Sequence, residues 1–235
     1  MNLKSETFKL RTAHCDVFRK LRLSELFTRF QEIAIADTEE HDMGRDKTLD
    51  RGLLWVVTGY RVEINRLPEY DETVTLETWA GKTMHVFFPR YFRMKDAAGN
   101  VILQASSFWV LIDASVRKVI FPEEAGVFME EVKVEDPPAF PRPPRIGETP
   151  EEVPFTVTYS TLDLNGHMNN TRYFDAVQDA IYPLKKAAPP RLIQVEFKNE
   201  ARPGETFMIR YGETDGVVSV VGEADRMIFR MSLTY

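Results

Sequence analysis

The chain has 235 residues, of which 43% are hydrophobic and 28% charged, and its formal net charge at pH 7 is −6. This composition is that of an ordinary globular protein with length for one large core or two smaller ones, and it excludes a disordered or fibrous chain. The acidic balance argues against a general affinity for nucleic acid. The single cysteine, Cys15, excludes an internal disulfide framework and favours a reducing compartment.

Neither a membrane span nor a metal centre is expected. No run approaches the roughly 18 apolar residues that a span needs, and residues 1–9 lack the apolar core of a signal peptide. A strand already begins near Phe8 and leaves no room for a plastid transit peptide, so we expect a cytoplasmic protein. The four histidines lack the paired spacing of a zinc site, so we expect no metal and no other cofactor.

The first half of the chain predicts one helix and an antiparallel meander. The helix begins near Ser24 and carries its apolar residues on one face, namely Leu26, Phe27, Phe30, Ile33 and Ala34. Alternating apolar residues predict strands at 8–12, 52–64, 73–78, 84–94 and 101–112. This order suits an α+β fold in which a sheet wraps around a single helix.

A proline-rich stretch divides the chain. Residues 136–150 contain six prolines, which fix φ and remove ladder donors, so we expect an extended linker that belongs to neither sheet. Beyond it, the patterns predict a strand at 153–158, a helix from Asn169 to Tyr182, and strands near 192–200, 205–212, 217–223 and 227–235. We therefore expect a first domain at 1–133, a linker at 134–150 and a second domain at 151–235.

The two halves look like degenerate copies of one unit. The run V-E-I-N-R-L-P-E-Y-D-E-T at 62–73 aligns without a gap with V-E-F-K-N-E-A-R-P-G-E-T at 195–206. Short charged runs align easily by chance, but both halves also share the order strand, helix, meander. Together these features predict a tandem repeat, in which one chain supplies both partners of a paired fold.

Polar side chains suited to acyl chemistry converge before the second helix. Asp163, Asn165 and His167 alternate through a segment that contains Gly166, and Asn169 and Asn170 follow at the expected helix start. A helix N-terminus presents unpaired N–H groups and a field that favours developing negative charge. The spacing alone supports equally well a polar loop that caps the helix, with His167 a bystander at the surface.

The run from Asp163 to Tyr173, D-L-N-G-H-M-N-N-T-R-Y, resembles the signature of the acyl-ACP thioesterases, a family of paired hotdog domains in plant plastids and many bacteria. Segments at 55–64, 77–79 and 105–113 of the first half are also similar to that family. The resemblance implies a tandem hotdog fold with one active site per chain, because the first half has no D-x-N-x-H counterpart. The tryptophans Trp55, Trp79 and Trp109 are expected in the core or in a tunnel wall.

The resemblance also implies the site residues. Asp163, Asn165 and His167 fall on the D-x-N-x-H of the family, and Glu200 falls on its glutamate from the adjacent strand. Glu200 is then the favoured base or nucleophile, His167 a hydrogen-bond donor or proton shuttle, and Asn165 the residue that orients water or carbonyl. Asp163 would position these groups or share the carboxylate role.

Amides near Asn169 and Asn170 would polarise the thioester carbonyl. Many plant members carry a cysteine directly after the glutamate. Here that position is Ala201, so a Cys–His mechanism is not expected.

The expected reaction is hydrolysis of fatty acyl-[acyl carrier protein] to free fatty acid, with acyl carrier protein as partner. Basic residues Arg172, Lys185, Lys186, Lys198 and Arg202 would dock the acidic carrier near the entrance. Three alternatives remain at this point: an acyl-CoA thioesterase of the hotdog superfamily, a hotdog dehydratase, which the polar set fits poorly, and a non-catalytic acyl-binding hotdog protein. Chain-length preference and homodimer formation are left open.

Overall fold

The computed structural model describes residues 3–41, 43–184 and 188–235. Its first half follows the predicted order of elements, which are β1 (Lys4–Lys9), α1 (Leu23–Glu40), β2 (Leu53–Ile64), β3 (Thr73–Ala80), β4 (Phe88–Asp96), β5 (Val101–Asp113), β6 (Val119–Ile120) and α2 (Pro122–Ala125). β4 begins later than the predicted Met84 because Met84 and Phe87 pair across a tight turn at His85, whose φ is +55°. β1 lies earlier than predicted, because Thr12 already starts a short 3₁₀ helix.

The second half repeats that order with β7 (Glu151–Thr156), α3 (Arg172–Ile181), β8 (Leu192–Phe197), β9 (Thr206–Thr214), β10 (Val217–Glu223) and β11 (Met227–Thr234). α3 starts three residues later than the predicted Asn169, with Thr171 as its N-cap. The aligned runs at 62–73 and 195–206 both lead from the end of one strand to the start of the next, β2 to β3 and β8 to β9. The predicted tandem repeat is therefore present in the fold.

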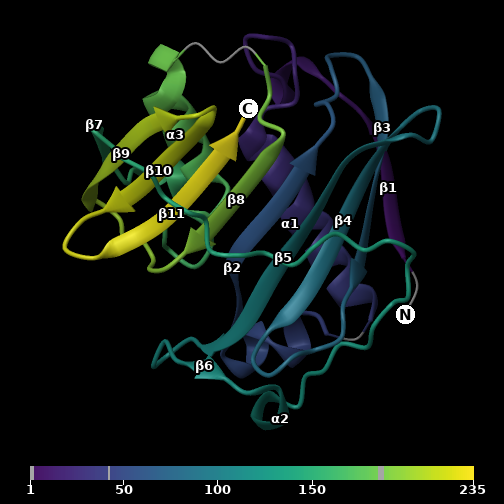
Figure 1. Ribbon diagram of the computed structural model, residues 1–235. Helices are drawn as coiled ribbons and strands as arrows, with labels where there is room; N and C mark the ends of the chain where they lie inside the picture. The colour runs from purple at the N-terminus through teal and green to yellow at the C-terminus, as the bar shows by residue number, and fades with distance from the viewer. Residues whose placement is uncertain (1–2, 42, 185–187) are drawn as a thin grey trace.

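All strands belong to one antiparallel sheet rather than to two separate sheets. Its order is β1-β3-β4-β5-β2-β8-β11-β10-β9-β7, with β6 paired to β5. Each half thus has the same internal order, with β7 in the place of β1 and β8 in the place of β2. The halves join where β2 pairs with β8, from Gly59 opposite Glu196 to Glu63 opposite Leu192. Figure 1 shows the resulting continuous sheet, which curves from β1 to β7.

Both main helices pack on the same side of this sheet (Figure 1). The apolar face predicted for α1 is buried, and α3 buries Tyr173, Phe174 and Val177. The helices meet through the rings of Phe27 and Phe174, which stack with centroids 3.6 Å apart. Burial of such large side chains is the main favourable contribution to folding. Each half is an antiparallel sheet wrapped around a helix, and the fold is the tandem hotdog that the sequence predicts.

The proline-rich segment crosses the sheet on the face opposite α1 (Figure 1). It contains no helix or strand, as expected. Hydrogen bonds nevertheless fix it to the sheet. Its carbonyls at Glu135, Ala139 and Arg142 accept hydrogen bonds from side chains of β4, β5 and β8. The N–H of Gly147 donates to Ser219 Oγ of β10 at 2.9 Å. The segment is therefore a packed strap across both halves.

Within the described parts of the chain, no helix combines the length and apolar character required to cross a membrane.

Candidate active site

The loop from Leu162 to Met168 is shaped by Asp163. The Asp163 carboxylate accepts hydrogen bonds from the backbone N–H of Asn165 at 2.8 Å and of His167 at 3.4 Å. The Asp163 backbone closes the turn, since its N–H donates to His167 O and its carbonyl accepts from Gly166 N. Gly166 has φ of +78°, a left-handed conformation that glycine adopts without steric cost. The sequence D-x-N-G-H therefore folds locally into a turn that projects Asn165 and His167.

Three further bonds fix this loop against α3 and the neighbouring strand connection. Met168 N donates to Ala201 O at 3.0 Å, and Asn169 N donates to Thr161 O at 2.8 Å. The Asn169 side chain accepts from Thr171 N at 2.9 Å, directly before α3 begins. The Asn169 amide, predicted as a donor to the substrate carbonyl, is thus already used within the fold. The Asn170 backbone N–H has no acceptor among the described residues and can still serve as a donor, whereas the Asn170 side chain lies against Tyr60.

Glu200 and His167 meet beside this loop, and an arginine from the other half joins them. His167 Nε2 lies 3.3 Å from Glu200 Oε2. Arg117 Nη2 donates to Glu200 Oε2 at 2.8 Å and lies 2.8 and 3.1 Å from the two His167 ring nitrogens. All three side chains are partly exposed, at 40% for Glu200, 22% for His167 and 32% for Arg117. The structure therefore places a carboxylate, an imidazole and a guanidinium together at an accessible site.

Sequence reasoning missed Arg117, which lies in the turn between β5 and β6. The turn is built around Asp113, whose carboxylate accepts bonds from Ser115 Oγ and from the N–H groups of Ser115 and Val116. These bonds hold the pKa of the Asp113 carboxyl below its usual range. Arg117 itself has φ of +57°, a backbone conformation that costs a non-glycine residue free energy. The Arg117 side chain is held by its bonds to Glu200 and His167, and the sequence alone does not reveal them.

Glu200 is also positioned from its backbone. Arg226 Nη2 donates to the Glu200 carbonyl at 2.7 Å, and Arg226 Nη1 bonds Glu205 at 2.7 Å. The hydrogen bond from Arg226 keeps the pKa of Glu205 below its usual value, although burial partly opposes this. Glu205 therefore stays ionised and anchors Arg226, which in turn fixes the connection that carries Glu200 and Ala201.

The remaining predicted site residues differ in how firmly they are held. Asn165 is exposed, and its side chain bonds none of the described residues, so it is available to a water or a carbonyl. Asn170 lies near Tyr60 of β2 and partly offsets the rise in the Tyr60 pKa that burial causes. Cys15 is buried, burial raises its pKa, and its Sγ bonds Arg11 O, so it takes no part in the cluster.

A cavity of about 360 Å³ opens beside Leu164 of this loop. It lies between α1 and the strands β2, β4 and β5, and Trp55, Phe88 and Trp109 form much of its wall. Trp79, by contrast, is a buried core residue that stacks on Tyr91. The tryptophans thus divide between core and cavity wall, as predicted. In the described residues, no group of three or more His, Cys, Asp or Glu side chains is arranged to hold a metal ion.

Both halves of the chain match models of a known protein family. Residues 2–124 match the sequence model of the acyl-ACP thioesterase N-terminal domain, and residues 146–231 match that of the acyl-ACP thioesterase C-terminal domain. The chain belongs to the acyl-ACP thioesterase family.

Curated acyl-ACP thioesterases of plants are similar to most of the chain. The chloroplastic palmitoyl-acyl carrier protein thioesterase of Cuphea hookeriana is 26% identical over 193 residues, which cover 76% of this chain and 46% of that protein. The chloroplastic dodecanoyl-[acyl-carrier-protein] hydrolase of Cinnamomum camphora is 24% identical over 74% of this chain and 50% of its own length. The chain spans about half the length of the curated relatives it matches.

Solved structures of acyl-ACP thioesterases share the fold. A putative oleoyl thioesterase from Lactobacillus plantarum superposes with a TM-score of 0.85 at 24% identity, covering 99% of this chain and 95% of that one. The 12:0-ACP thioesterase from Umbellularia californica gives a TM-score of 0.84 at 19% identity, covering 99% and 96%. At these identities the superpositions establish the tandem hotdog fold, and the roles of individual residues must be argued from the site itself.

Proposed function

We propose that the protein hydrolyses the thioester of fatty acyl chains carried by acyl carrier protein and releases the free fatty acid. The observation that carries this proposal is the cluster of Glu200, His167 and Arg117 at an accessible site, with an apolar cavity beside the loop that supplies His167. Membership of the acyl-ACP thioesterase family supports it. An acyl chain would lie in the cavity, with its thioester at the cluster.

In the proposed reaction, Glu200 acts on a water molecule that attacks the thioester carbonyl carbon. The water proton passes to Glu200, and the carbonyl oxygen becomes an oxyanion. Collapse of this intermediate breaks the C–S bond, and the thiolate takes up the proton through His167, which lies 3.3 Å from Glu200. The alternative in which Glu200 attacks directly gives a mixed anhydride that water then hydrolyses. Both routes need the same three side chains.

Arg117 has two roles in this scheme. It holds Glu200 and His167 in contact before substrate binds, because its Nη2 bonds both. Its positive charge lies where negative charge develops, together with the free Asn170 amide at the start of α3. Loss of one such donor raises a reaction barrier by about 3 kcal/mol. Asp163, whose carboxylate is used by the loop backbone, is assigned to positioning rather than to chemistry.

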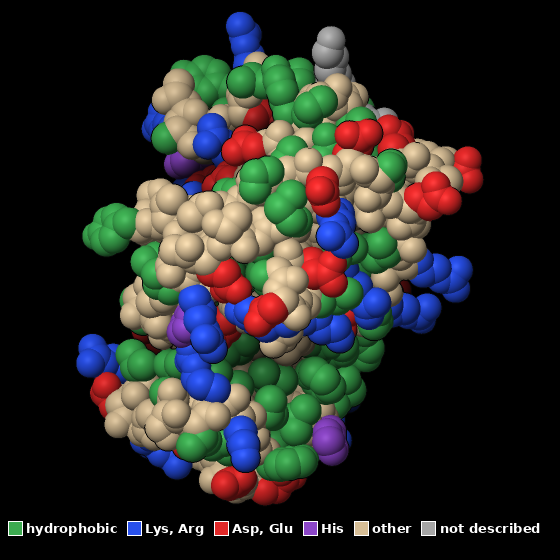
Figure 2. Space-filling model, turned by 90° about the vertical axis from the view of Figure 1, so that its left-hand side faces the viewer, with side chains coloured by type: hydrophobic (Ala, Val, Ile, Leu, Met, Phe, Trp, Pro, Cys, Tyr) green, Lys and Arg blue, Asp and Glu red, His purple; other side chains and the backbone are tan. Residues whose placement is uncertain are grey.

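We propose that the carrier protein docks on basic side chains around the site formed by Glu200, His167 and Arg117. Figure 2 shows Lys and Arg side chains across the middle of one face, with Asp and Glu side chains among them. Of the predicted docking residues, Arg202 is exposed, whereas Arg172 and Lys198 also pair with Asp175 and Glu196. Lys185 and Lys186 lie outside the described residues. The mixed charges imply docking that is selective for the carrier and sensitive to salt.

The decisive experiment measures thiol release from matched acyl-ACP and acyl-CoA substrates at low and high salt. We expect faster release from acyl-ACP, with kcat/KM for that substrate falling steeply as salt rises. Faster release from acyl-CoA would instead identify an acyl-CoA thioesterase. Binding of acyl-ACP without thiol release would identify a non-catalytic acyl-binding protein.

Three further assignments remain predictions. The division into domains at 1–133 and 151–235 awaits expression of the separate parts. A cytoplasmic location is favoured by the single buried cysteine, Cys15, whereas the curated plant relatives are named as chloroplastic proteins. Homodimer formation is left to a measurement of mass in solution.

A further inference from the structure

The cavity beside Leu164 is not uniformly apolar. Its aromatic wall is interrupted by Arg90 of β4 and Thr38 of α1. Arg90 is only 5% exposed, and its partner Asp37 only 2%. A buried guanidinium in the wall of a pocket costs free energy unless it is paired and its N–H groups are hydrogen-bonded, because desolvation of a charge opposes burial.

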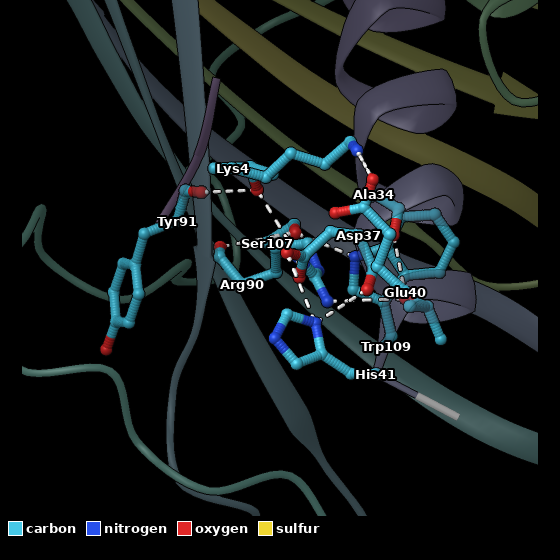
Figure 3. Close-up of polar contacts among 11 residues, drawn as sticks. Lys4, Ala34, Asp37, Glu40, His41, Arg90, Tyr91, Ser107 and Trp109 are labelled. Atoms are coloured by element: carbon cyan, nitrogen blue, oxygen red, sulfur yellow. Dashed lines mark hydrogen bonds and ion pairs between the residues drawn. The ribbon is translucent and has the colours of Figure 1, made fainter. Parts of the chain in front are cut away.

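Arg90 is held firmly but is not fully satisfied. Its Nη1 donates to Asp37 Oδ2 at 2.6 Å and to Thr78 Oγ1 at 3.5 Å, and its Nη2 donates to Thr38 Oγ1 at 3.3 Å. Figure 3 shows Arg90 and Asp37 pointing toward each other between α1 and the strands. A guanidinium has five N–H groups. In Arg90, the N–H on Nε and one of the two on Nη2 have no acceptor among the described residues. These donors are fixed in place by the bonds that the others make.

A second donor of the same wall also lacks an acceptor. The indole N–H of Trp55 is buried and has no hydrogen-bond partner within the described chain. Trp109, the other cavity tryptophan, differs because its indole N–H donates to Ser107 Oγ at 2.8 Å. The Trp55 N–H has almost no accessible surface, so it does not open into the cavity, and the donors offered to a ligand are those of Arg90.

The charge of the cluster defines the acceptor. Burial lowers the pKa of the Arg90 guanidinium, and the Asp37 carboxylate opposes this. The two opposite charges pair at 2.6 Å, and His41 Nδ1 lies 3.5 Å from the other Asp37 oxygen. A carboxylate on the ligand would add an uncompensated negative charge beside Asp37. An uncharged hydroxyl or keto oxygen accepts a hydrogen bond without that cost.

We propose that this cavity selects acyl chains that carry one uncharged oxygen, a hydroxyl or a keto group, which accepts hydrogen bonds from the free N–H groups of Arg90. The proposal rests on the proposed thioesterase function and deepens it by naming the substrate class. A saturated chain leaves the free Arg90 N–H groups unpaired when it fills the cavity and excludes water. An oxygenated chain satisfies them at one position along its length.

The test compares dodecanoyl and hexadecanoyl chains with derivatives that carry one hydroxyl or one keto group at successive carbons, all on the carrier protein. We expect kcat/KM for one position of the oxygen to exceed that of the saturated chain by about tenfold or more. Equal rates for all derivatives, or a preference for the saturated chain, would overturn the proposal.

A double variant separates recognition from folding. Removing Arg90 alone would leave the buried Asp37 carboxylate without its partner. The double variant Asp37→Leu with Arg90→Met replaces the pair by apolar side chains of similar size, a change that folded proteins often tolerate. We expect this variant to lose the preference and to favour the saturated chain. The matched control is Arg61→Met with Glu63→Leu, which removes a pair that does not line the cavity and should leave the preference unchanged.

Calorimetry with free fatty acids distinguishes failure of this proposal from failure of the proposed function. If no acyl-ACP releases thiol but the hydroxy acid binds more tightly than the saturated acid, the cavity assignment holds and the hydrolytic function is wrong. If thiol is released but the double variant keeps the wild-type preference in both rate and binding, the hydrolytic function holds and the Arg90 pair is purely structural.

Discussion

Two loops of this protein share a backbone but differ in chemistry. Residues 15–21 in the first half and 162–168 in the second each close with a bridge, Cys15 to Leu21 and Leu162 to Met168. Asp16 Oδ1 accepts from the N–H of Phe18 at 2.9 Å and of Lys20 at 3.0 Å, as Asp163 does from Asn165 and His167. Leu21 N donates to Pro68 O, as Met168 N donates to Ala201 O. Position by position, Phe18, Lys20 and Leu67 therefore stand where the second half has Asn165, His167 and Glu200.

The comparison shows that neither the loop nor a cavity is enough to bring a carboxylate and an imidazole together. A cavity of about 420 Å³ lies beside the first loop, lined by Phe18, Lys20 and Leu67 among others, and is larger than the one beside Leu164. Neither cavity is lined by a histidine. In the described residues, the second loop has a carboxylate and an imidazole in contact, and an arginine from the opposite half bonds both. The two halves thus share a frame and differ in the few side chains placed on it.

The largest effect is expected from Glu200→Gln, which removes the carboxylate and makes the second loop as inert as the first. We expect kcat for acyl-ACP to fall by about 10³-fold with little change in the melting temperature, since the amide keeps the shape of the side chain. The control is Glu69→Gln, which alters the carboxylate beside Lys20 of the first loop and should leave kcat unchanged. Near-wild-type turnover by Glu200→Gln would refute its assignment as base or nucleophile.

Arg117→Met tests the contribution of the first half to the active loop. We expect a loss of about 10²-fold, mainly in kcat, because the charge that stabilises the developing oxyanion is removed. Lys118→Met changes the neighbouring exposed cation and should affect only the salt dependence. A rise in KM alone for Arg117→Met would show that the arginine only binds the substrate or carrier.

Asp16→Ala and Asp163→Ala test whether the two loops are built alike. Each removes an acceptor of two backbone N–H groups, and we expect each to lower the free energy of unfolding by about 1–2 kcal/mol, measured by chemical denaturation. Only Asp163→Ala should also reduce thiol release, because it releases His167 from its position. If the destabilisation is confined to one variant, the loops are not energetically equivalent.

The smallest effect concerns the residues with positive φ in the two turns. Arg19 has φ of +63° where the second loop has Gly166 at +78°. We expect Arg19→Gly to stabilise the protein by roughly 0.5 kcal/mol and Gly166→Ala to destabilise it by about 1 kcal/mol. A shift of the same sign in both melting temperatures would contradict the equivalence of the turns.

Local patterns predict most of the fold because they reflect local physics. The face of α1 follows from the spacing of Phe27, Phe30 and Ile33, and the strap follows from its prolines. The seam between β2 and β8 was not predictable in the same way. It depends on which two edge strands pair, and the apolar alternation of a strand does not indicate the strand with which it pairs.

The candidate site shows the same limit. Asp163, Asn165, His167 and Glu200 are visible because a short motif and an aligned strand end carry them. Arg117 lies 50 residues from His167 and 83 from Glu200, in a turn whose sequence D-A-S-V-R-K looks like ordinary surface. The first loop was equally hidden, because its only shared functional residue is Asp16. Only the structure shows that Arg117 lies close to His167 and Glu200, and that the two loops share a backbone shape.

The joining of both halves in one chain has an evolutionary consequence. In a homodimer of identical hotdogs, symmetry imposes every substitution twice, so a loop with Phe18 and Lys20 and a loop with Asn165 and His167 could not coexist in one molecule. The strap and the β2–β8 seam hold the two copies together while leaving their sequences independent. Because the halves can differ in sequence, the second can carry Asn165 and His167 while the first contributes Arg117 to the same cluster.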